Sequence, residues 1–345
     1  MAGQDRTVAG ACLKPVLWVL SCLYGVIVIV ACALYRRGVW RVYKARKPVV
    51  SVGNITAGGV GKTPIVMLIA EYLFRKGLHP VVLTRGYMSG GPSSAASSDE
   101  ALMMAERLKG VRVVVNPDRV AAVQALQSDT ALDLFIMDDG FQHWRLARDL
   151  DIVAIDATAP LGRGHVLPRG LLREPLTALR RAGLFIITKT DIGQGQMDDI
   201  RRLLAWVNPR CPVVETIHAP VAAHELWQGR GSSDLVSLRD RVIALSAIGA
   251  PDTFTATLRQ CGAVVEGVFA YEDHHVYTSE DARAIVRSCM EKKIMKVVTT
   301  EKDAVKLRGL KEAFQGVSLW VLEINLKVVH GETELFSRLD RCCHP

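Results

Sequence analysis

The sequence lacks any C-x-x-C motif, in which two residues separate a pair of cysteines. Its cysteines are Cys12, Cys22, Cys32, Cys211, Cys261, Cys289, Cys342 and Cys343. Neither a zinc site nor a disulfide framework is therefore indicated, and a reducing compartment fits. No nucleic-acid-binding module or internal repeat is recognisable either. The net charge of +8 therefore favours an anionic membrane surface or a phosphorylated substrate as partner, and we expect no nucleic acid.

One stretch, residues 16–35, lacks charge altogether and is long enough to cross a bilayer. Basic residues follow at once, which predicts that the rest of the chain is cytoplasmic: Arg36, Arg37, Arg41, Lys44, Arg46 and Lys47. A cleaved signal peptide is disfavoured because the apolar run is long for one. A helix that lies in the membrane interface stays open as an alternative.

Residues 49–73 have the order of a phosphate-binding loop: an apolar run, a glycine-rich turn and an apolar helical pattern. Backbone N–H groups of such a turn wrap phosphate oxygens, and the helix N-terminus adds positive potential. We expect Lys62 to reach the outer phosphates of ATP and the Thr63 hydroxyl to bind Mg²⁺. The predicted ATP-binding residues are Asn54, Thr56, Gly58, Gly59, Val60, Gly61, Lys62, Thr63 and Pro64.

This loop departs from the strict pattern, which has glycine where this chain has Thr56. Its core resembles the deviant phosphate-binding loop of ParA-like and MinD-like ATPases, which carry lysine at the position of Ala57. A glycine-rich turn that binds nothing is the weaker alternative, because Gly61, Lys62 and Thr63 stand at the strand–helix junction.

A second apolar run ends in Asp138 and Asp139, directly before Gly140. Carboxylates at the carboxyl end of such a strand are typical Mg²⁺ ligands in phosphoryl-transfer enzymes. We therefore predict that Thr63 and one or both aspartates hold Mg²⁺. An Asp-Asp-Gly turn exposed to solvent is the alternative.

Apolar runs alternate with helical patterns from residue 48 onward, which indicates a parallel sheet covered on both faces. We predict an α/β fold with a P-loop NTPase-type parallel sheet domain, a smaller α/β domain and an N-terminal membrane helix. The expected boundaries are residues 1–47, 48–235 and 236–345. The expected strands are residues 48–52, 80–84, 111–115, 132–137, 151–155, 184–188, 212–217, 241–246, 264–269, 297–300 and 318–322.

Several motifs occur together in one order: GNITAGGVGKTP, Arg85-Gly86-Tyr87, Ser98-Asp99-Glu100, DDGFQHWRLARDLDIV, LLREPL, Asp273-His274-His275 and TTEKDAVKL. This set resembles the tetraacyldisaccharide 4′-kinases of lipid A synthesis over nearly the whole chain. The resemblance implies transfer of the ATP γ-phosphate to the 4′-hydroxyl of a lipid-linked glucosamine disaccharide 1-phosphate, which gives lipid IVA. It also implies Mg²⁺, two domains that close over the site, and attachment to inner membrane lipids on the cytoplasmic side. No protein partner is indicated.

The resemblance also assigns roles to residues. Asp99, with Asp273 and His274, would activate the acceptor hydroxyl; a helix N-cap is an adequate alternative explanation of Asp99, but the resemblance favours the catalytic role. With Asp99 in the first domain and His274 in the second, only domain closure would bring them together. The predicted acceptor-binding residues are Arg119, Gln142, His143 and Arg173. Arg119 and Arg173 could equally be solvent-exposed surface charges.

The chain departs from the family around LPRGLLREP, at Arg169 and Leu171, and at Arg163. These departures leave the role of that loop open. The main alternative function is a ParA/MinD-like membrane-associated regulatory ATPase, against which Ala57 counts. A GTPase is supported only by residues 188–191, which resemble a base-reading element without its asparagine.

Overall fold

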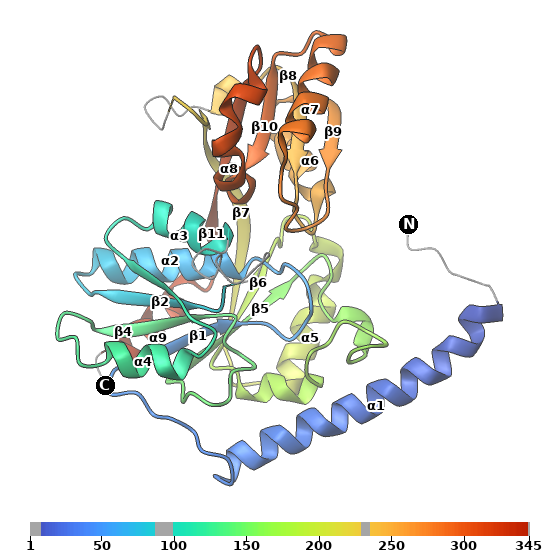
Figure 1. Cartoon of the computed structure of the whole chain (residues 1–345). Coiled ribbons are helices and arrows are strands. Elements are labelled where there is room, and N and C mark those ends of the chain that lie inside the picture. Colours follow the sequence, from blue (N-terminus) through green and yellow to red (C-terminus); the bar gives the residue numbers. More distant parts are fainter. Residues whose placement is uncertain (1–7, 87–98, 229–234, 344–345) are drawn as a thin grey trace. The chain divides into compact units, whose positions relative to one another are not determined.

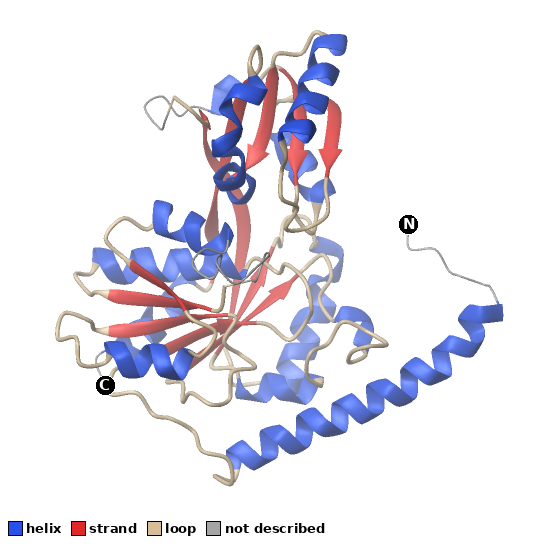
Figure 2. Cartoon of the chain, viewed as in Figure 1, coloured by secondary structure: helices blue, strands red, loops and turns tan. Residues whose placement is uncertain are grey.

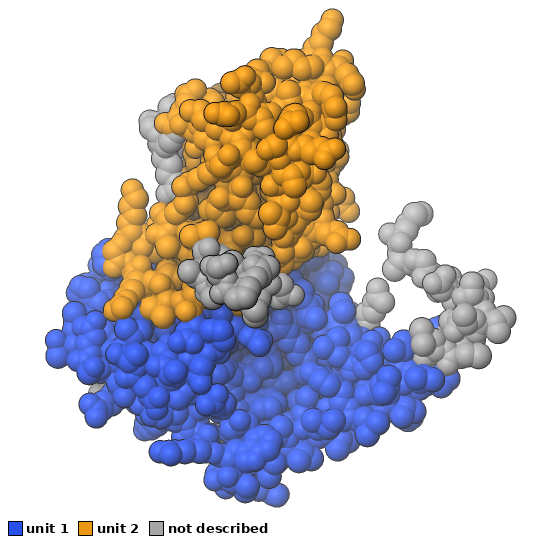
Figure 3. Space-filling model, viewed as in Figure 1, with its two compact units in different colours: residues 1–85, 116–217, 328–345 blue, residues 86–115, 218–327 orange. Residues whose placement is uncertain are grey.

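The computed structural model describes residues 8–86, 99–228 and 235–343. The chain forms two compact units, each assembled from separate segments (Figure 3). Unit 1 comprises Met1–Arg85, Asn116–Ile217 and Val328–Pro345, and unit 2 comprises Gly86–Val115 and His218–Lys327. This division differs from the contiguous split at residue 235, because a segment from each half of the chain packs with the other half. The small polar loop at residues 90–98 and most of the linker at 228–233 lie outside the described residues.

Unit 1 contains a parallel sheet with the strand order β2-β4-β1-β5-β6-β7 (Figures 1 and 2). Its strands are β1 (Val49–Gly53), β2 (Pro80–Thr84), β4 (Leu134–Asp138), β5 (Leu150–Asp156), β6 (Leu184–Thr188) and β7 (Val213–Glu225). Its helices are α1 (Val8–Arg36), α2 (Lys62–Arg75), α4 (Arg119–Leu126), α5 (Met197–Val207) and α9 (Glu332–Cys343).

Every residue of β1, β2, β4 and β6 is buried, which explains their nearly continuous apolar sequences. Phe141, Phe185 and Leu179 are fully buried in one core cluster of this unit. Because the strands are parallel, their carboxyl ends meet at one edge of the sheet. Polar residues end three of these strands, at Thr84, Asp138 and Thr188.

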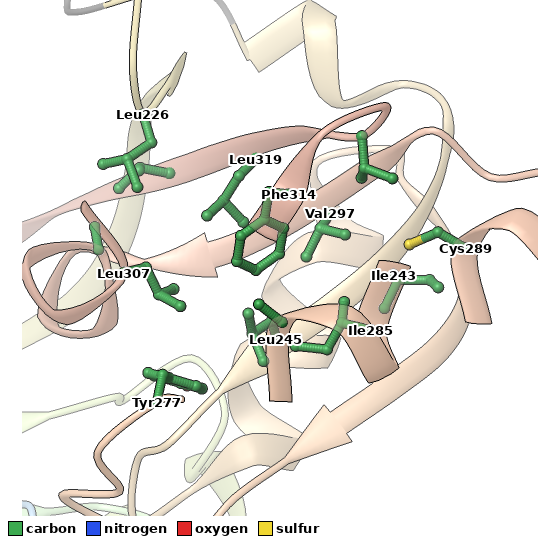
Figure 4. Close-up of a cluster of buried hydrophobic side chains, with 14 of the residues drawn as sticks. Leu226, Ile243, Leu245, Tyr277, Ile285, Cys289, Val297, Leu307, Phe314 and Leu319 are labelled. Carbon is green, nitrogen blue, oxygen red and sulfur yellow. The ribbon is translucent and has the colours of Figure 1, made fainter. Parts of the chain in front are cut away.

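Unit 2 contains strands in the order β11-β10-β8-β9, again parallel. They are β8 (Arg241–Ser246), β9 (Val264–Ala270), β10 (Lys296–Thr300) and β11 (Ser318–His330). The unit also contains α3 (Asp99–Arg107), β3 (Arg112–Val115), α6 (Pro251–Gln260), α7 (Ser279–Lys292) and α8 (Glu301–Leu307). Its core includes Phe314, Leu245 and Ile285 (Figure 4).

The predicted fold class is confirmed. Strands β7 and β11 extend well beyond the predicted residues 212–217 and 318–322. In each case the apolar pattern ends before the strand does. The strands continue because β7 and β11 pass from one unit into the other. The sequence pattern also missed α9.

Candidate active site

The loop between β1 and α2 has the backbone of a phosphate-binding loop. Gly58 and Gly61 adopt φ values of 116° and 82°, which residues with a side chain rarely adopt. A Cβ atom added to Gly58 or Gly59 would meet no atom within 4 Å. These two glycines therefore face open space, where a ligand can approach the loop backbone.

Lys62 is held at this loop by two oxygen atoms. Its Nζ lies 3.0 Å from Asn54 Oδ1 and 3.2 Å from Asp139 Oδ1. Asn54 is fully buried, and its Nδ2 donates to the carbonyl oxygen and the hydroxyl of Thr56 at 2.6 and 3.1 Å. Asn54 and Thr56 thus shape the loop from within, and the ammonium group of Lys62 lies beside the carboxylate of Asp139.

The Asp138–Asp139 pair follows the end of β4 as predicted. Asp138 is 3% exposed, and its Oδ2 accepts a hydrogen bond from the Thr84 hydroxyl at 3.2 Å. Asp139 has a positive φ of 50°, and both its carboxylate oxygens accept from Arg173 Nη1, at 3.0 and 2.9 Å. Burial alone would raise the pKa of Asp139, but Lys62 and Arg173 outweigh it and hold that pKa below its usual value.

Two glycines allow the aspartate turn and the phosphate loop to approach closely. A Cβ atom on Gly53 would lie 2.6 Å from the Cβ and backbone N of Phe141. A Cβ atom on Gly140 would lie 2.7 Å from the Ser51 hydroxyl oxygen. An added side chain would therefore meet the Phe141 backbone at Gly53, and the side chains of Ser51 and Met137 at Gly140.

Gln142 connects the same two motifs. Its Nε2 donates to the Asn54 carbonyl at 2.9 Å and to Glu174 Oε1 at 3.1 Å. Glu174 is 1% exposed and pairs with both nitrogens of Arg181, at 2.7 and 3.0 Å. The Arg181 guanidinium in turn lies 4.3 Å from the centre of the Phe141 ring. Sequence reasoning assigned no role to Glu174 or Arg181. The only signal for Glu174 was the quoted LLREPL motif, and Arg181 lies outside that motif.

The LPRGLLREP segment braces the phosphate loop through its backbone. Ala57 N donates to the Leu171 carbonyl at 2.6 Å, and Arg173 N donates to the Ile55 carbonyl at 2.7 Å. Thr56 and Leu172 form an antiparallel bridge between them. Because the contact at Leu171 uses the carbonyl while its side chain is 42% exposed, the departure from the family at this position preserves the interaction.

Residues 188–191 end β6 next to the phosphate loop. The Thr188 hydroxyl donates to the Val60 carbonyl at 2.9 Å. Lys189 is buried, has a positive φ of 56° and forms an ion pair with the buried Asp156 at the end of β5. The segment is a strand end and turn, and the Thr188 hydroxyl stabilises the phosphate loop through its bond to Val60.

One predicted acceptor-binding residue, Arg119, is buried rather than a solvent-exposed surface charge, and another, His143, is half-buried. Arg119 is 5% exposed, and its Nη2 donates to the Asp138 carbonyl at 2.9 Å. Burial lowers the pKa of Arg119. Burial, followed by the charges of Arg119, Arg145 and Arg148, lowers the pKa of His143 to about 4, so this imidazole is neutral at pH 7.

A second polar cluster lies within unit 2. His274, with a positive φ of 67°, has its Nδ1 3.8 Å from Asp99 Oδ2 and its Nε2 3.9 Å from Asp273 Oδ2. Asp99 and His274 thus belong to the same unit. The prediction that only domain closure would bring them together is wrong, because the segment that carries Asp99 packs with the second half of the chain.

Two lysines of α8 bind this acidic cluster. Lys306 Nζ lies 3.5 Å from Asp99 Oδ2 and 2.9 Å from Oδ1 of the fully buried Asp303. Lys302 Nζ lies 2.9 Å from Asp273 Oδ1 and 3.7 Å from Glu100 Oε1. The lysines stand one helical turn apart on the same face. They come from the TTEKDAVKL motif, for which no role was predicted.

The neighbouring His275 has different partners. Its Nε2 lies 3.1 Å from Asp281 Oδ2, and its ring stacks on Tyr271 with centroids 4.4 Å apart. Asp281 also belongs to the capping box of α7 with Thr278. His275 is therefore bound into the local structure, whereas His274 faces the Asp99 carboxylate.

Comparison with known proteins shows the family to which this chain is similar. A family model described as tetraacyldisaccharide-1-P 4′-kinase matches residues 13–344. The chain belongs to the tetraacyldisaccharide 4′-kinase family. A tetraacyldisaccharide 4′-kinase of Anaeromyxobacter sp. strain K is 39% identical over 325 residues, with 89% of this chain and 85% of the relative covered.

Two further relatives extend the match. The tetraacyldisaccharide 4′-kinase of Halothermothrix orenii is 35% identical and covers 92% of this chain and 91% of its own length. The crystal structure titled as the "apo" form of LpxK from Aquifex aeolicus in complex with ATP is 27% identical. It has a TM-score of 0.73 and covers 96% of this chain and 100% of its own. The regulatory ATPase and GTPase alternatives are not favoured by these family members.

Proposed function

We propose that the chain transfers the γ-phosphate of ATP to the 4′-hydroxyl of a tetraacylated glucosamine disaccharide 1-phosphate. The observation that carries the proposal is the joint packing of the two family motifs: Lys62 of the phosphate loop contacts Asp139 of the DDGFQH turn. The hydroxyl oxygen forms a bond to the γ-phosphorus, the bond from that phosphorus to the β–γ bridging oxygen breaks, and ADP leaves. The hydroxyl proton passes to the Asp99–His274 pair.

The nucleotide is bound by unit 1 in this proposal. Loop amides at Gly58, Gly59 and Gly61 would contact the phosphates, while the Lys62 ammonium neutralises charge on the γ-phosphate. Asn54 and Asp139 orient the Lys62 side chain at the loop.

The residues near the loop fit Mg²⁺ by their donor chemistry. No group of three or more His, Cys, Asp or Glu side chains within residues 8–86, 99–228 and 235–343 is arranged to hold a metal ion alone. Mg²⁺ differs in that it commonly takes one or two protein oxygens and completes its shell with phosphate oxygens and water. The Thr63 hydroxyl and the Asp138 carboxylate would supply those oxygens, since both Asp139 oxygens already accept from Arg173. When bound, the ion would neutralise charge on the β- and γ-phosphates.

Asp99 and His274 would accept the proton of the acceptor hydroxyl, with Asp99 orienting the imidazole. Asp273, which contacts the other ring nitrogen, stays a proposed member of this group. Acceptor binding by Arg119, Gln142, His143 and Arg173 also stays a prediction. Closure of two domains over the substrates, which the family resemblance implies, is likewise a prediction.

The acceptor is a lipid, so we infer attachment to the cytoplasmic side of the bacterial inner membrane. Helix α1 supports this location, because Lys14–Arg36 is the one helix among the described residues that is long and apolar enough to cross a membrane. Its mean hydropathy is 2.6, and the basic residues 36–47 directly follow it.

Acceptor dependence tests the proposed function. Release of ADP by the purified full chain in detergent micelles is measured with and without the tetraacyl disaccharide 1-phosphate. The proposal expects release to rise strongly when the acceptor is added. Equal ADP release in both conditions would indicate a regulatory ATPase instead.

A further inference from the structure

Helix α1 has one face that packs against the rest of unit 1. Ser21 is 5% exposed and Val28 is 9% exposed, and Gly25 between them is also buried. The spacing of four and then three residues places them on one stripe of the helix. Large apolar side chains elsewhere on α1 are exposed by about half: Trp18, Val19, Leu20, Leu23, Val26, Ile27, Ile29 and Val30.

The buried stripe is hydrogen-bonded to the segment that braces the phosphate loop. The Ser21 hydroxyl donates to the Val166 carbonyl at 2.6 Å, and the Tyr24 hydroxyl donates to the Arg173 carbonyl at 3.0 Å. Arg173 N in turn donates to the Ile55 carbonyl of the phosphate loop. One continuous set of contacts therefore leads from the middle of α1 to the nucleotide site.

The segment that follows α1 is hydrogen-bonded to the rest of unit 1. Tyr43 N donates to the Arg145 carbonyl, and Ala147 N donates to the Tyr43 carbonyl, both at 2.8 Å. The Tyr35 ring at the helix end lies 5.0 Å from the Trp40 ring and 6.0 Å from the Trp144 ring, between centroids. Such aromatic groups favour the headgroup level of a membrane.

These contacts exclude a simple membrane crossing by α1. Ser21 and Tyr24 lie near the middle of the apolar stretch Lys14–Arg36, so a spanning helix would place them near the bilayer centre. Their partners, the loop carbonyls of Val166 and Arg173, would then enter the hydrocarbon with the charged side chain of Arg173. Irregular backbone and charged side chains are costly there.

We propose that α1 lies in the plane of an anionic bilayer surface, with the Ser21–Gly25–Val28 stripe docked on unit 1 and the exposed apolar side chains in the lipid. The exposed basic residues Arg36, Arg37, Arg41, Lys44 and Arg46 complement anionic headgroups. Through Tyr24 and Ser21, the lipid-bound helix also holds the loop that positions the nucleotide site. This second part rests on the proposed kinase function, whereas the in-plane orientation does not.

Protease protection of tagged full-length chains tests the orientation. One full-length chain carries an epitope tag at its N-terminus, and a second carries the tag at its C-terminus. Each is treated with protease in spheroplasts and in inverted membrane vesicles. An in-plane helix leaves both tags protected in spheroplasts and digested in inverted vesicles. Digestion of the N-terminal tag in spheroplasts would show that α1 spans the membrane and would overturn the proposal, whatever the enzyme activity.

The coupling to the site is tested with the double variant Ser21→Ala/Tyr24→Phe, and with Trp18→Phe on the exposed face as the matched control. Each lost hydrogen bond is expected to change kcat/KM for ATP on the order of 5-fold, with membrane retention and melting temperature near wild type. Ser21→Thr, which keeps a hydroxyl, is expected to retain activity. Wild-type kcat/KM in the double variant, or a loss of membrane retention as its only defect, would overturn the coupling.

Discussion

At the scale of single residues, the proposed function depends most on the charge of Lys62. Lys62 is only 14% exposed and lies between Asn54 and Asp139. Lys62→Ala is expected to lower the rate of phosphoryl transfer on the order of 10²-fold or more, because the charge that clamps the transferred group is lost. Lys76→Ala is the control, since Lys76 ends the same helix, is 46% exposed and pairs with Asp340. Steady-state rates of the two variants decide this prediction.

His143 provides a residue-scale prediction about pH. Its folded pKa of about 4 lies below the usual histidine value of 6.5, so the unfolded chain binds a proton more readily. Between pH 6.5 and 4 this residue therefore destabilises the folded state progressively, by at most about 3 kcal/mol at the acid end. His143→Gln is expected to flatten the pH dependence of the free energy of unfolding in this window. An unchanged slope in urea titrations at pH 6.5, 5.5 and 4.5 would contradict the shift.

At the scale of elements, close approach of the β1 end to the aspartate turn defines the nucleotide site. Gly53→Ala would place a Cβ atom 2.6 Å from the Phe141 backbone N, so either turn must move. We expect a loss of about 1–3 kcal/mol of unfolding free energy, accompanied by weaker nucleotide binding. Gly195→Ala, where an added Cβ meets no atom within 4 Å, is the control. Chemical denaturation and nucleotide titration of both variants check the prediction.

Helix α8 makes a separate element-scale prediction. Lys306 bridges Asp99 and the fully buried Asp303, so Lys306→Met would leave a buried carboxylate with one fewer cation and Asp99 less constrained. We expect turnover to fall on the order of 10-fold or more while ATP affinity stays near wild type, with a stability loss of about 3 kcal/mol. Lys306→Arg should recover part of the turnover, and Lys311→Met is the surface control. Turnover equal to wild type in folded Lys306→Met would remove α8 from the catalytic account.

At the scale of the whole molecule, the parts that sequence could predict are those encoded by adjacent residues. The apolar strands, the glycine turn and the Asp138–Asp139 pair are each encoded by a local sequence pattern. In the structure, the turn and the two aspartates lie at the carboxyl edge of the parallel sheet. Other contacts could not be predicted because no local sequence pattern encodes them. Examples are the ion pair of Arg181 with Glu174 and the ion pair of Lys306 with Asp99. The unit boundaries were missed for the same reason, because packing of residues 99–115 with the second half of the chain depends on contacts distant in sequence.

The most direct test of the central claim follows the label from ATP. The full chain is incubated with γ-³²P-labelled ATP and the tetraacyl disaccharide 1-phosphate, lipids are separated from nucleotides, and the position of the new phosphate is assigned by NMR. The account predicts labelled lipid with the phosphate on the 4′-oxygen for the wild type, and strongly reduced label for Asp99→Ala and His274→Ala with ATP affinity retained. Turnover of ATP that puts no label into the lipid, or label at another hydroxyl, would contradict it.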